Sequence, residues 1–235
     1  HYELLRGKVL ALLFLEPSTR TACSFQAAML RLGGTCLTVA DAGKRSSVAK
    51  GESVEDTVRT LESYADAAIV RSPVVGAAAA AAAAARKPVI NAGDGIGAHP
   101  TQALLDVFTM REELGTVNGL TVTFVGDLRH GRTVHSLARL LSLYAVRLRY
   151  VSPASLRMPG EVLEAVAARG VEQSEHGSLD DVLRETDVLY VTRVQRERFD
   201  TAGEYDAVCH EFIITPKTLA RAKETAIVMH PLPRL

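Results

Sequence analysis

Four polar side chains stand together behind an apolar run, in the stretch EPSTRTACSF at residues 16 to 25. They are Ser18, Thr19, Arg20 and Thr21, and a helix is predicted to begin among them. A helix N-cap needs one hydroxyl, so ordinary capping accounts for only one of these residues. A phosphate needs several donors that converge on the positive end of a helix, with an arginine fork among them. The sequence therefore predicts an anion site here.

Further polar residues follow the next apolar runs. Arg71 comes directly after the run AAIV. The segment HPTQ begins a helix behind PVINAG, and it supplies His99 and Gln102. A single histidine in such a place more often has a structural role than a catalytic one. Together with Arg71, however, these residues form a second polar cluster that is expected on the same edge of a sheet.

A third cluster, GDLRHGRTVHSL at residues 126 to 137, follows the run LTVTFV. Its first eight residues read G-x-x-x-x-G-R-T, one residue away from the P-loop signature of nucleotide-binding proteins. Arg132 replaces the lysine that would reach the phosphates, and no acidic residue at a strand end stands out as a magnesium ligand. A nucleotide enzyme is therefore an alternative that the sequence disfavours.

Two more apolar runs end in groups that could bind a ligand. Arg193 and Gln195 follow DVLYVT, and extended backbone would direct both side chains to one side because they lie two residues apart. The run IVM precedes HPLPR, which begins at His230. Both segments are expected to face the same ligand as the other clusters.

Composition narrows the class of protein and of ligand. The chain has 235 residues, 47% hydrophobic and 23% charged, which is typical of a globular protein with a sizeable core. Lysine plus arginine equals aspartate plus glutamate at 27 each, so an anion must be held by local arginines, and neither nucleic acid nor a membrane is an expected partner. The three cysteines show no C-x-x-C spacing, which argues against a disulfide framework and a zinc site. A cytoplasmic location is expected.

Apolar β-rich runs alternate with amphipathic stretches along the chain, which predicts α/β architecture with parallel sheets. The turn formers GTVNG at residues 115 to 119 divide the pattern, so domains are expected at 1–115 and 116–235. Each is predicted to be a doubly wound parallel sheet, with the active site in the cleft between the two domains. The predicted strands are residues 9–15, 35–41, 67–71, 88–93, 120–127, 147–152, 187–193 and a short run at 227–229; the predicted helices lie near 25–32, 54–61, 77–85, 99–114, 133–144, 160–169 and 178–186. Ligands of such sheets bind beyond the carboxyl ends of the strands, where the polar clusters lie.

Taken together, STRTACSF, KGES, HPTQ, GDLRHGRTVHSL, RVQRERF and HPLPR resemble the aspartate transcarbamoylases, within the aspartate/ornithine transcarbamoylase family. The resemblance spans nearly the whole chain. S-T-R-T with H-P-x-Q is shared across the family and implies carbamoyl transfer. R-V-Q and H-P-L-P-R resemble the aspartate enzymes, whereas ornithine enzymes have S-M-G and H-C-L-P segments that do not occur here. Ornithine or another amino acid as acceptor is the nearest alternative.

The resemblance implies transfer of a carbamoyl group from carbamoyl phosphate to L-aspartate, with no cofactor, no metal and no covalent intermediate. Carbamoyl phosphate is expected at Ser18, Thr19, Arg20, Thr21, Arg71, His99, Gln102 and the carbonyls of Leu232 and Pro233. The carboxylates of aspartate are expected at Arg132 and at Arg193 with Gln195. The catalytic roles fall to Arg20, Thr21, Lys50, Arg71 and His99.

The segment DAGKRSSVAKGES at residues 41 to 53 has the composition of a flexible, solvated basic loop. The resemblance implies that it enters the active site of a neighbouring subunit in a homotrimer, where Ser46 and Lys50 contribute and Lys50 also contacts aspartate. Ser47 is a weaker candidate than Ser46, and Glu52 would link the loop to arginines of its own subunit. Regulatory chains or fused domains are further expected partners.

Two departures from the family pattern stand out. Ala22 occupies a position where many relatives have a second arginine, which removes a charge near the anion site but no direct ligand. The resemblance also implies one helix before His1 and another after HPLPR, so the sequence is expected to be part of a longer chain. A catalytically silent subunit that serves assembly is the third alternative.

Overall fold

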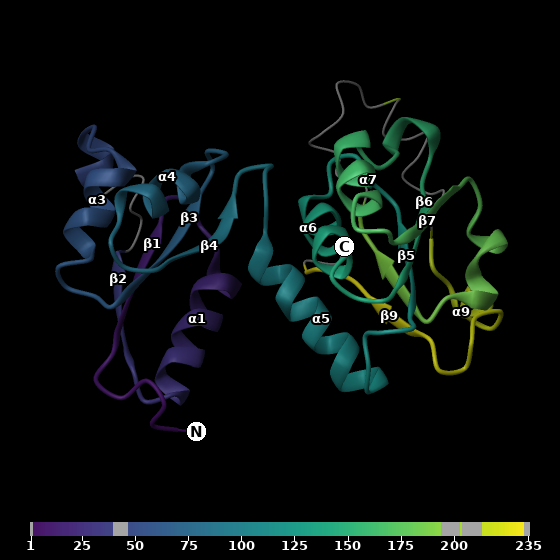
Figure 1. The fold of residues 1–235 in the computed structure, drawn as a ribbon, viewed down its shortest axis with the longest axis horizontal. Helices are drawn as coiled ribbons and strands as arrows, with labels where there is room; N and C mark the ends of the chain where they lie inside the picture. Colours follow the sequence, from purple (N-terminus) through teal and green to yellow (C-terminus); the bar gives the residue numbers. More distant parts are fainter. Residues whose placement is uncertain (1, 40–46, 194–202, 204–212, 233–235) are drawn as a thin grey trace. The chain divides into compact units, whose positions relative to one another are not determined.

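The structure is a computed structural model, which describes residues 2–39, 47–193, 203 and 213–232. The chain divides into two compact units, His1–Thr101 and Gln102–Leu235. Each unit is built on a parallel sheet with helices beside it, which confirms the predicted α/β class (Figure 1). The predicted boundary at residue 115 lies at the C-terminal end of helix α5 (Pro100–Leu114), whereas the division by contacts lies at its N-terminal end.

The first unit contains a four-stranded parallel sheet in the order β2-β1-β3-β4. Its strands are β1 (Val9–Phe14), β2 (Thr35–Val39), β3 (Ala67–Ser72) and β4 (Val89–Asp94). Its helices are α1 (Thr19–Arg31), the 3-10 turn η1 (Ser47–Lys50), α3 (Val54–Leu61) and α4 (Ala77–Ala84). The central strands β1 and β3 are buried almost throughout, which explains why they read as continuous apolar runs.

Alternate residues of β1 pack into different layers of the first unit. Leu10, Leu12 and Phe14 join Met29 of α1 in one cluster. Ala11 and Leu13 face the other layer, which α3 and α4 form. The buried residues that α4 contributes are alanines, so this layer is thin.

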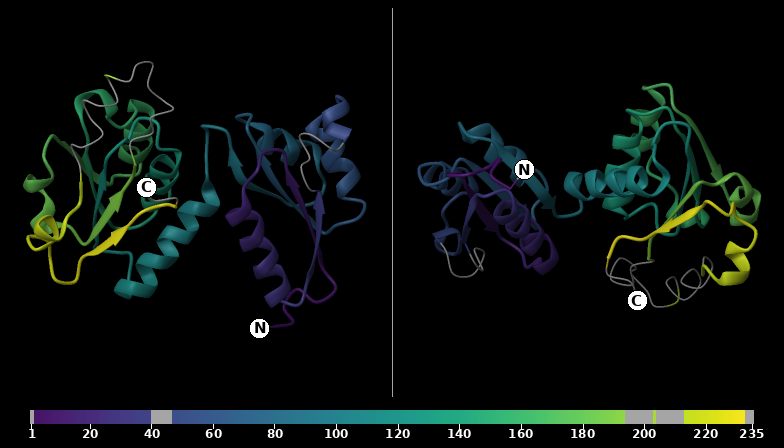
Figure 2. Two further views of the ribbon diagram at one scale, coloured as in Figure 1. Left: turned by 180° about the vertical axis from the view of Figure 1, so that it is seen from behind. Right: turned by 90° about the horizontal axis from the view of Figure 1, so that it is seen from below.

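The second unit contains a five-stranded parallel sheet in the order β7-β6-β5-β8-β9. Its strands are β5 (Thr121–Val125), β6 (Arg147–Val151), β7 (Glu172–His176), β8 (Val188–Val191) and β9 (Ile227–Met229), the last of which is yellow at the sheet edge in Figure 2. Its helices and turns are α5, α6 (Arg132–Leu141), η2 (Ala154–Leu156), α7 (Gly160–Ala167), η3 (Leu179–Asp181), η4 (Leu183–Glu185) and α9 (Pro216–Leu219). In the described ranges, no helix is both long enough and apolar enough to cross a membrane.

Aromatic side chains fill the centre of the second unit. Phe124 stacks on Tyr150 with ring centroids 5.7 Å apart, and it meets Tyr190 edge-on at 5.6 Å. Helices α5, α6 and α7 contribute apolar side chains to the same cluster. The hydroxyl of Tyr190 is a polar group inside this apolar core, and it therefore needs a hydrogen-bonding partner.

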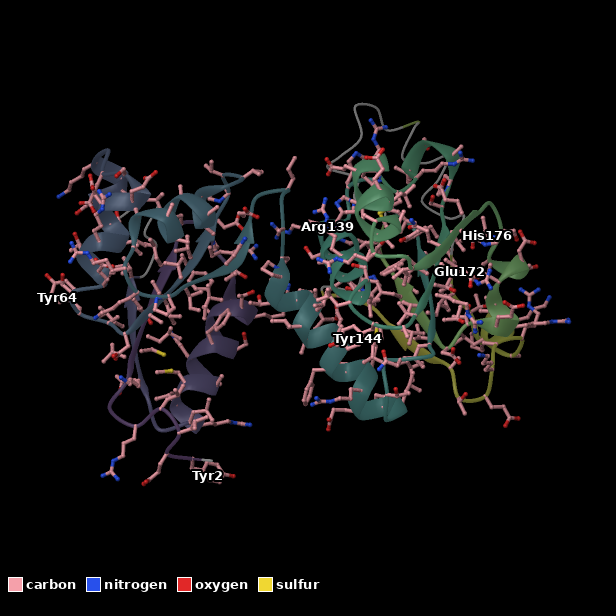
Figure 3. The ribbon with its side chains drawn as sticks, viewed as in Figure 1. Tyr2, Tyr64, Arg139, Tyr144, Glu172 and His176 are labelled. Atoms are coloured by element: carbon pink, nitrogen blue, oxygen red, sulfur yellow. The ribbon has the colours of Figure 1, made fainter. Side chains whose placement is uncertain are left out.

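Two sequence expectations differ from this fold. The helix predicted at residues 178 to 186 is wrong: the segment forms the 3-10 turns η3 and η4, because the Ser178 hydroxyl accepts from the Asp180 amide and Val182 leaves helical geometry at φ −123°. Strand β7 was not predicted, since EQSEH is polar and has no apolar alternation. Its ends, Glu172 and His176, lie on the edge strand of the sheet (Figure 3).

Candidate active site

The first polar cluster of the sequence lies at the carboxyl edge of the first sheet, together with Arg71 and His99 of the second cluster. Strands β1 and β3 are parallel neighbours with Phe14 opposite Arg71. The Leu15 amide donates to the Arg71 carbonyl over 2.8 Å, so the chain leaving β1 runs directly beside Arg71 before it enters α1. This pairing brings the anion-binding segment predicted from sequence to the same edge as the predicted arginine.

The N-terminus of α1 has the geometry of an anion site. Ser18 occupies the N-cap position, but its side chain makes no capping bond to the helix amides. Its hydroxyl donates instead to Thr21 Oγ1 over 2.9 Å, which leaves the Thr21 hydroxyl hydrogen to donate to a ligand. Arg20 is exposed beside them. The helix thus presents amides, a hydroxyl and a guanidinium where its dipole is positive.

Arg71 is buried and held in one orientation. Its Nε donates to Glu16 Oε1 over 2.5 Å, and its Nη1 donates to the Ala92 carbonyl over 2.9 Å. A side chain at Gly93, whose φ is +117°, would place its Cβ 2.5 Å from Arg71 Nη1, so glycine is what allows the guanidinium to pass. Within the described part of the chain, Nη2 has no hydrogen-bonding partner, so it can serve a ligand.

His99 extends the cluster through Arg71. Its Nε2 lies 3.3 Å from Arg71 Nη1, and its Nδ1 lies 3.5 Å from Thr101 Oγ1. Because arginine only donates, Nε2 must accept, which places the proton of the neutral imidazole on Nδ1. The structure therefore brings His99 and Arg71 together, as the sequence predicts.

Three candidate residues of the second unit, Arg132, Arg193 and Leu232, follow neighbouring strands at the carboxyl edge of its sheet. Strands β5 and β8 are neighbours, and the Thr192 amide donates to the Val125 carbonyl over 2.8 Å. A Cβ at Gly126 would lie 2.3 Å from the Thr192 carbonyl oxygen, so the loop after β5 touches the segment after β8. Arg132 begins α6 at the end of that loop, and Arg193 follows Thr192 directly. Leu232, which is 59% exposed, comes shortly after β9, the strand beside β8.

The loop after β5 does not have the arrangement that a P-loop requires. The buried carboxylate of Asp127 accepts from the His130 amide over 3.0 Å, and its other oxygen lies 3.1 Å from His130 Nδ1. A P-loop directs such amides at a phosphate. Here a carboxylate already occupies one of them, which argues against nucleotide binding.

A hydrogen-bonded chain in the second unit was not predicted from sequence. Gln102 Nε2 donates to Asp106 Oδ1 over 3.0 Å, and the Tyr190 hydroxyl donates to Asp106 Oδ2 over 2.8 Å. Burial raises the pKa of Asp106 to about 6, although both hydrogen bonds favour the ionised form. Burial, together with the neighbouring Asp106 carboxylate, likewise raises the pKa of Tyr190. The side chain of Gln102, a predicted site residue, is thus anchored through Asp106 to the buried Tyr190.

Several predicted residues lie at or outside the limits of the described chain. Ser46, Gln195 and Pro233 are outside the described residues. Lys50 is exposed at the end of η1, and Glu52 accepts from the Thr57 hydroxyl over 2.7 Å. No group of metal-binding side chains occurs among the residues that the structure describes.

Sequence reasoning missed four residues that shape the site: Glu16, Gly93, Asp106 and Tyr190. Glu16 opens the EPSTR stretch, and a buried arginine nearby implies a carboxylate partner, so its role could have been inferred. Asp106 lies four residues after Gln102 on a helix, a spacing that permits this contact. Nothing local indicates Tyr190, because 84 residues separate it from Asp106.

Known proteins share both units of this chain. Residues 1–112 match the profile of the aspartate/ornithine carbamoyltransferase carbamoyl-P binding domain, and residues 118–235 match that of the Asp/Orn binding domain. The chain is 62% identical to multifunctional protein pyr1-3 of Dictyostelium discoideum, covering 99% of this chain and 10% of that protein. It is 50% identical to the aspartate carbamoyltransferase catalytic subunit of Thermoplasma acidophilum, covering 99% of this chain and 76% of that subunit.

A solved structure shows the same fold. It is the aspartate transcarbamoylase of Trypanosoma cruzi in complex with N-(phosphonacetyl)-L-aspartic acid, which is 45% identical, covers 99% of this chain and 74% of that chain, and superposes with a TM-score of 0.89. The chain therefore spans about a tenth of the multifunctional relative and about three quarters of the single-function ones. On the two domain profiles and these identities, the chain belongs to the aspartate/ornithine carbamoyltransferase family.

Proposed function

We propose that this chain transfers the carbamoyl group of carbamoyl phosphate to the amino group of L-aspartate, giving N-carbamoyl-L-aspartate and phosphate for pyrimidine biosynthesis. The observation that carries the proposal is the uncapped, donor-rich N-terminus of α1 beside the fixed Arg71–His99 pair. The relative from Thermoplasma acidophilum, an aspartate carbamoyltransferase catalytic subunit, supports aspartate as the acceptor.

Carbamoyl phosphate brings a dianionic phosphate, a carbonyl and an amide. Its phosphate binds the α1 N-terminus, where the helix amides, Arg20 and the hydroxyls of Ser18, Thr19 and Thr21 donate to it. Gln102 and the carbonyls of Leu232 and Pro233 receive the amide hydrogens. Each group of the ligand thus has a partner of matching polarity.

The reaction places negative charge on the carbonyl oxygen as the aspartate nitrogen attacks the carbon. Arg71 is the prepositioned donor for that charge, because Glu16 and Ala92 fix its guanidinium before substrate binds. His99 assists once its Nε2 carries a proton and turns from Arg71 to the oxygen. The C–N bond forms, the C–O bond to phosphate breaks, and a proton of the attacking amine leaves with the phosphate.

The acceptor is recognised by its two carboxylates. Arg132 takes one of them, and Arg193 with Gln195 takes the other, since guanidinium forks match carboxylates in a bidentate manner. Holding two small reactants in one orientation supplies much of the acceleration, because it removes the entropy of bringing them together.

The assembly that we propose is a cytoplasmic homotrimer in which Ser46 and Lys50 reach the active site of the neighbouring subunit, where Lys50 assists catalysis. Fusion to further domains is supported by the multifunctional relative, of which this chain matches about a tenth. Such fused domains would be partners of the catalytic chain.

The decisive experiment is an assay for phosphate release with carbamoyl phosphate and L-aspartate, run beside L-ornithine and ATP controls on the whole protein that contains this chain. Arg193→Ala should abolish the use of aspartate while the affinity for carbamoyl phosphate changes little. Arg20→Ala should weaken carbamoyl phosphate instead. Equal weakening of carbamoyl phosphate by both changes would contradict the division of labour between the two units.

Shared active sites have their own test. Arg20→Ala and Lys50→Ala chains, each nearly inactive, are dissociated, mixed in equal amounts and reassembled. About three quarters of random trimers are mixed, and each mixed trimer restores one site in three, so activity should return to about a quarter of the wild-type rate. Hybrids that form by native mass spectrometry and remain inactive would place Lys50 in its own subunit or outside the site.

A further inference from the structure

The second unit contains a buried polar chain that starts at a proposed substrate ligand. Gln102 donates to one oxygen of Asp106, and Tyr190 donates to the other. The Thr133 hydroxyl in turn bonds the Tyr190 oxygen. Asp106 is 4% exposed and Tyr190 is 0% exposed, so the surrounding core fixes the carboxylate and its tyrosine partner.

The direction of each hydrogen bond in this chain follows from the chemistry of the groups. An ionised carboxylate only accepts, so the group that Gln102 turns toward Asp106 must be its NH2. The amide oxygen of Gln102 then faces away from Asp106. The Tyr190 hydroxyl has one hydrogen, which goes to Asp106, so its oxygen accepts from Thr133.

The orientation of the Gln102 amide decides what that residue can recognise. The amide end of a carbamoyl group only donates, so it needs an acceptor such as a side-chain amide oxygen. A Gln102 side chain flipped by 180° would oppose one NH2 group with another and leave both unsatisfied. An acetyl group is close in size to a carbamoyl group, but it has a methyl group at this position. It therefore forms no hydrogen bond with the Gln102 amide oxygen.

We propose that Asp106 is a positioning residue that locks the Gln102 amide with its oxygen outward, and that it thereby selects carbamoyl phosphate over acetyl phosphate. The inference rests on the proposed function, which supplies the substrate. Tyr190 is the anchor that keeps the carboxylate itself from rotating.

Asp106 is buried where its charge is energetically unfavourable, which supports a role beyond packing. Burial raises its pKa to about 6, so at pH 8 the carboxylate is ionised in the apolar core and is held there by neutral donors. The titratable group that faces it from the adjoining strand is Tyr190, which stays protonated because its own pKa is raised. An apolar or amide residue would avoid the cost of this buried charge.

Substitution of Asp106 by asparagine reverses the donor and acceptor roles between this residue and Gln102. In Asp106→Asn, Tyr190 still donates, so the amide oxygen at position 106 turns toward Tyr190 and the NH2 group turns toward Gln102. Gln102 must then offer its oxygen inward and its NH2 outward. The additional change Tyr190→Phe removes that constraint, which lets the amide at position 106 turn back and accept from Gln102.

The test compares Asp106→Asn, the double variant with Tyr190→Phe, and Asp180→Asn, in the whole protein at pH 8. Asp180 is exposed on η3, so it provides the same chemical change outside this chain of contacts.

Calorimetry measures the binding of inorganic phosphate, acetyl phosphate and carbamoyl phosphate. In Asp106→Asn, carbamoyl phosphate should weaken ~10- to 100-fold while the other two ligands change less than about twofold. The double variant should recover most of that loss, and Asp180→Asn should match the wild type.

Two results would overturn the inference. One is equal weakening of all three ligands in Asp106→Asn, which would indicate a general packing defect. The other is a double variant that binds carbamoyl phosphate no better than Asp106→Asn. Failure of the wild-type protein to form N-carbamoyl-L-aspartate contradicts the proposed function instead, and the preference for carbamoyl over acetyl phosphate still tests the role of Asp106.

Discussion

Each unit of the chain uses one carboxylate to hold one site residue, but the two carboxylates are held in different ways. In the first unit, Glu16 pairs with the cation Arg71, and its side chain remains 25% exposed. In the second unit, Asp106 is only 4% exposed and accepts from two neutral donors, Gln102 and Tyr190. The first arrangement compensates the buried charge of an arginine, whereas the second leaves the charge of the carboxylate uncompensated.

The comparison shows that a site can hold a residue rigidly either with paired charges or with neutral donors alone. An ion pair such as Glu16–Arg71 neutralises both partners and fixes a donor for the reaction. Neutral donors orient Asp106 equally well, but they leave the cost of burial in place, and this cost raises the pKa of the carboxyl group. Charge should therefore matter most at Arg71, and protonation should matter most at Asp106.

The largest expected effect comes from removing the arginine of the first pair. Arg71→Ala deletes the prepositioned donor and should lower kcat by about 10²- to 10³-fold. It also leaves Glu16 without its cation. Steady-state kinetics with carbamoyl phosphate and aspartate measure the loss, and Arg71→Lys, which keeps the charge but not the fork, should recover only a part of it. A lysine variant as active as the wild type would contradict the importance of the fixed guanidinium.

The next effect is the contribution of Asp106 to the dependence of stability on pH. Its pKa is about 6 in the folded chain and near the ordinary value of 3.8 when unfolded, so the folded state binds the extra proton between these limits. The contribution of Asp106 to the free energy of unfolding should be largest below about pH 4 and should fall by about 3 kcal/mol as the pH rises past 6.

Urea unfolding of the wild type and of Asp106→Asn at several pH values measures this contribution, because other titrating groups cancel in the difference. The wild type should lose stability relative to the variant as pH rises from 4 to 7. A flat difference across that range would mean that Asp106 does not carry the raised pKa.

A smaller effect is expected from Glu16→Gln. The amide keeps an acceptor for Arg71 Nε but loses the charge, and hydrogen bonds to charged partners exceed neutral ones by about 1 kcal/mol. We expect a loss of about 1 kcal/mol in unfolding free energy and a fall in kcat of about tenfold or less. Thermal unfolding with kinetics checks both; a loss as large as that of Arg71→Ala would instead assign Glu16 a direct role in the reaction.

The smallest effect is expected at a pair that lies on the surface. Arg221 contacts both carboxylate oxygens of Asp180, and this partner lowers the pKa of Asp180. Both side chains are about half exposed, so solvent screens the attraction. Asp180→Asn should leave Tm without a measurable change at neutral pH, and a clear drop in Tm would show that exposure is a poor guide to the strength of these pairs.

The sequence predicted those parts of the fold that have a local physical signal. Continuous apolar runs identified β1, β3, β5 and β8 because parallel strands are buried on both faces. Strand β7 was not predicted because it is an edge strand made of polar residues, and its position depends on pairing with β6. The segment at residues 178 to 186 carries helix-forming residues, but the Ser178 turn and the break at Val182 override that preference.

The residues of the candidate site likewise differ in whether a local sequence signal identifies them. Clusters that are contiguous in sequence, such as residues 18 to 21 and HPTQ, could be found from residue types alone. The residues that orient the site have weaker sequence signals, because Arg71 meets Glu16 across 55 positions and Tyr190 meets Asp106 across 84. Local patterns therefore identify the groups that face a ligand more readily than the groups that orient them.

The order of the strand pairings has a consequence for synthesis on the ribosome. The pairings described for the first sheet lie within residues 9 to 94, so its four described strands have all been made while the second unit is still being synthesised. The second sheet differs, because β9 pairs Ile227 with Val188 and is the last of the described strands to emerge. Until then one side of β8 exposes unpaired backbone groups, which are a template for wrong pairing. The nascent chain should therefore be most exposed to aggregation, and most dependent on chaperones, in the interval between the synthesis of β8 and that of β9.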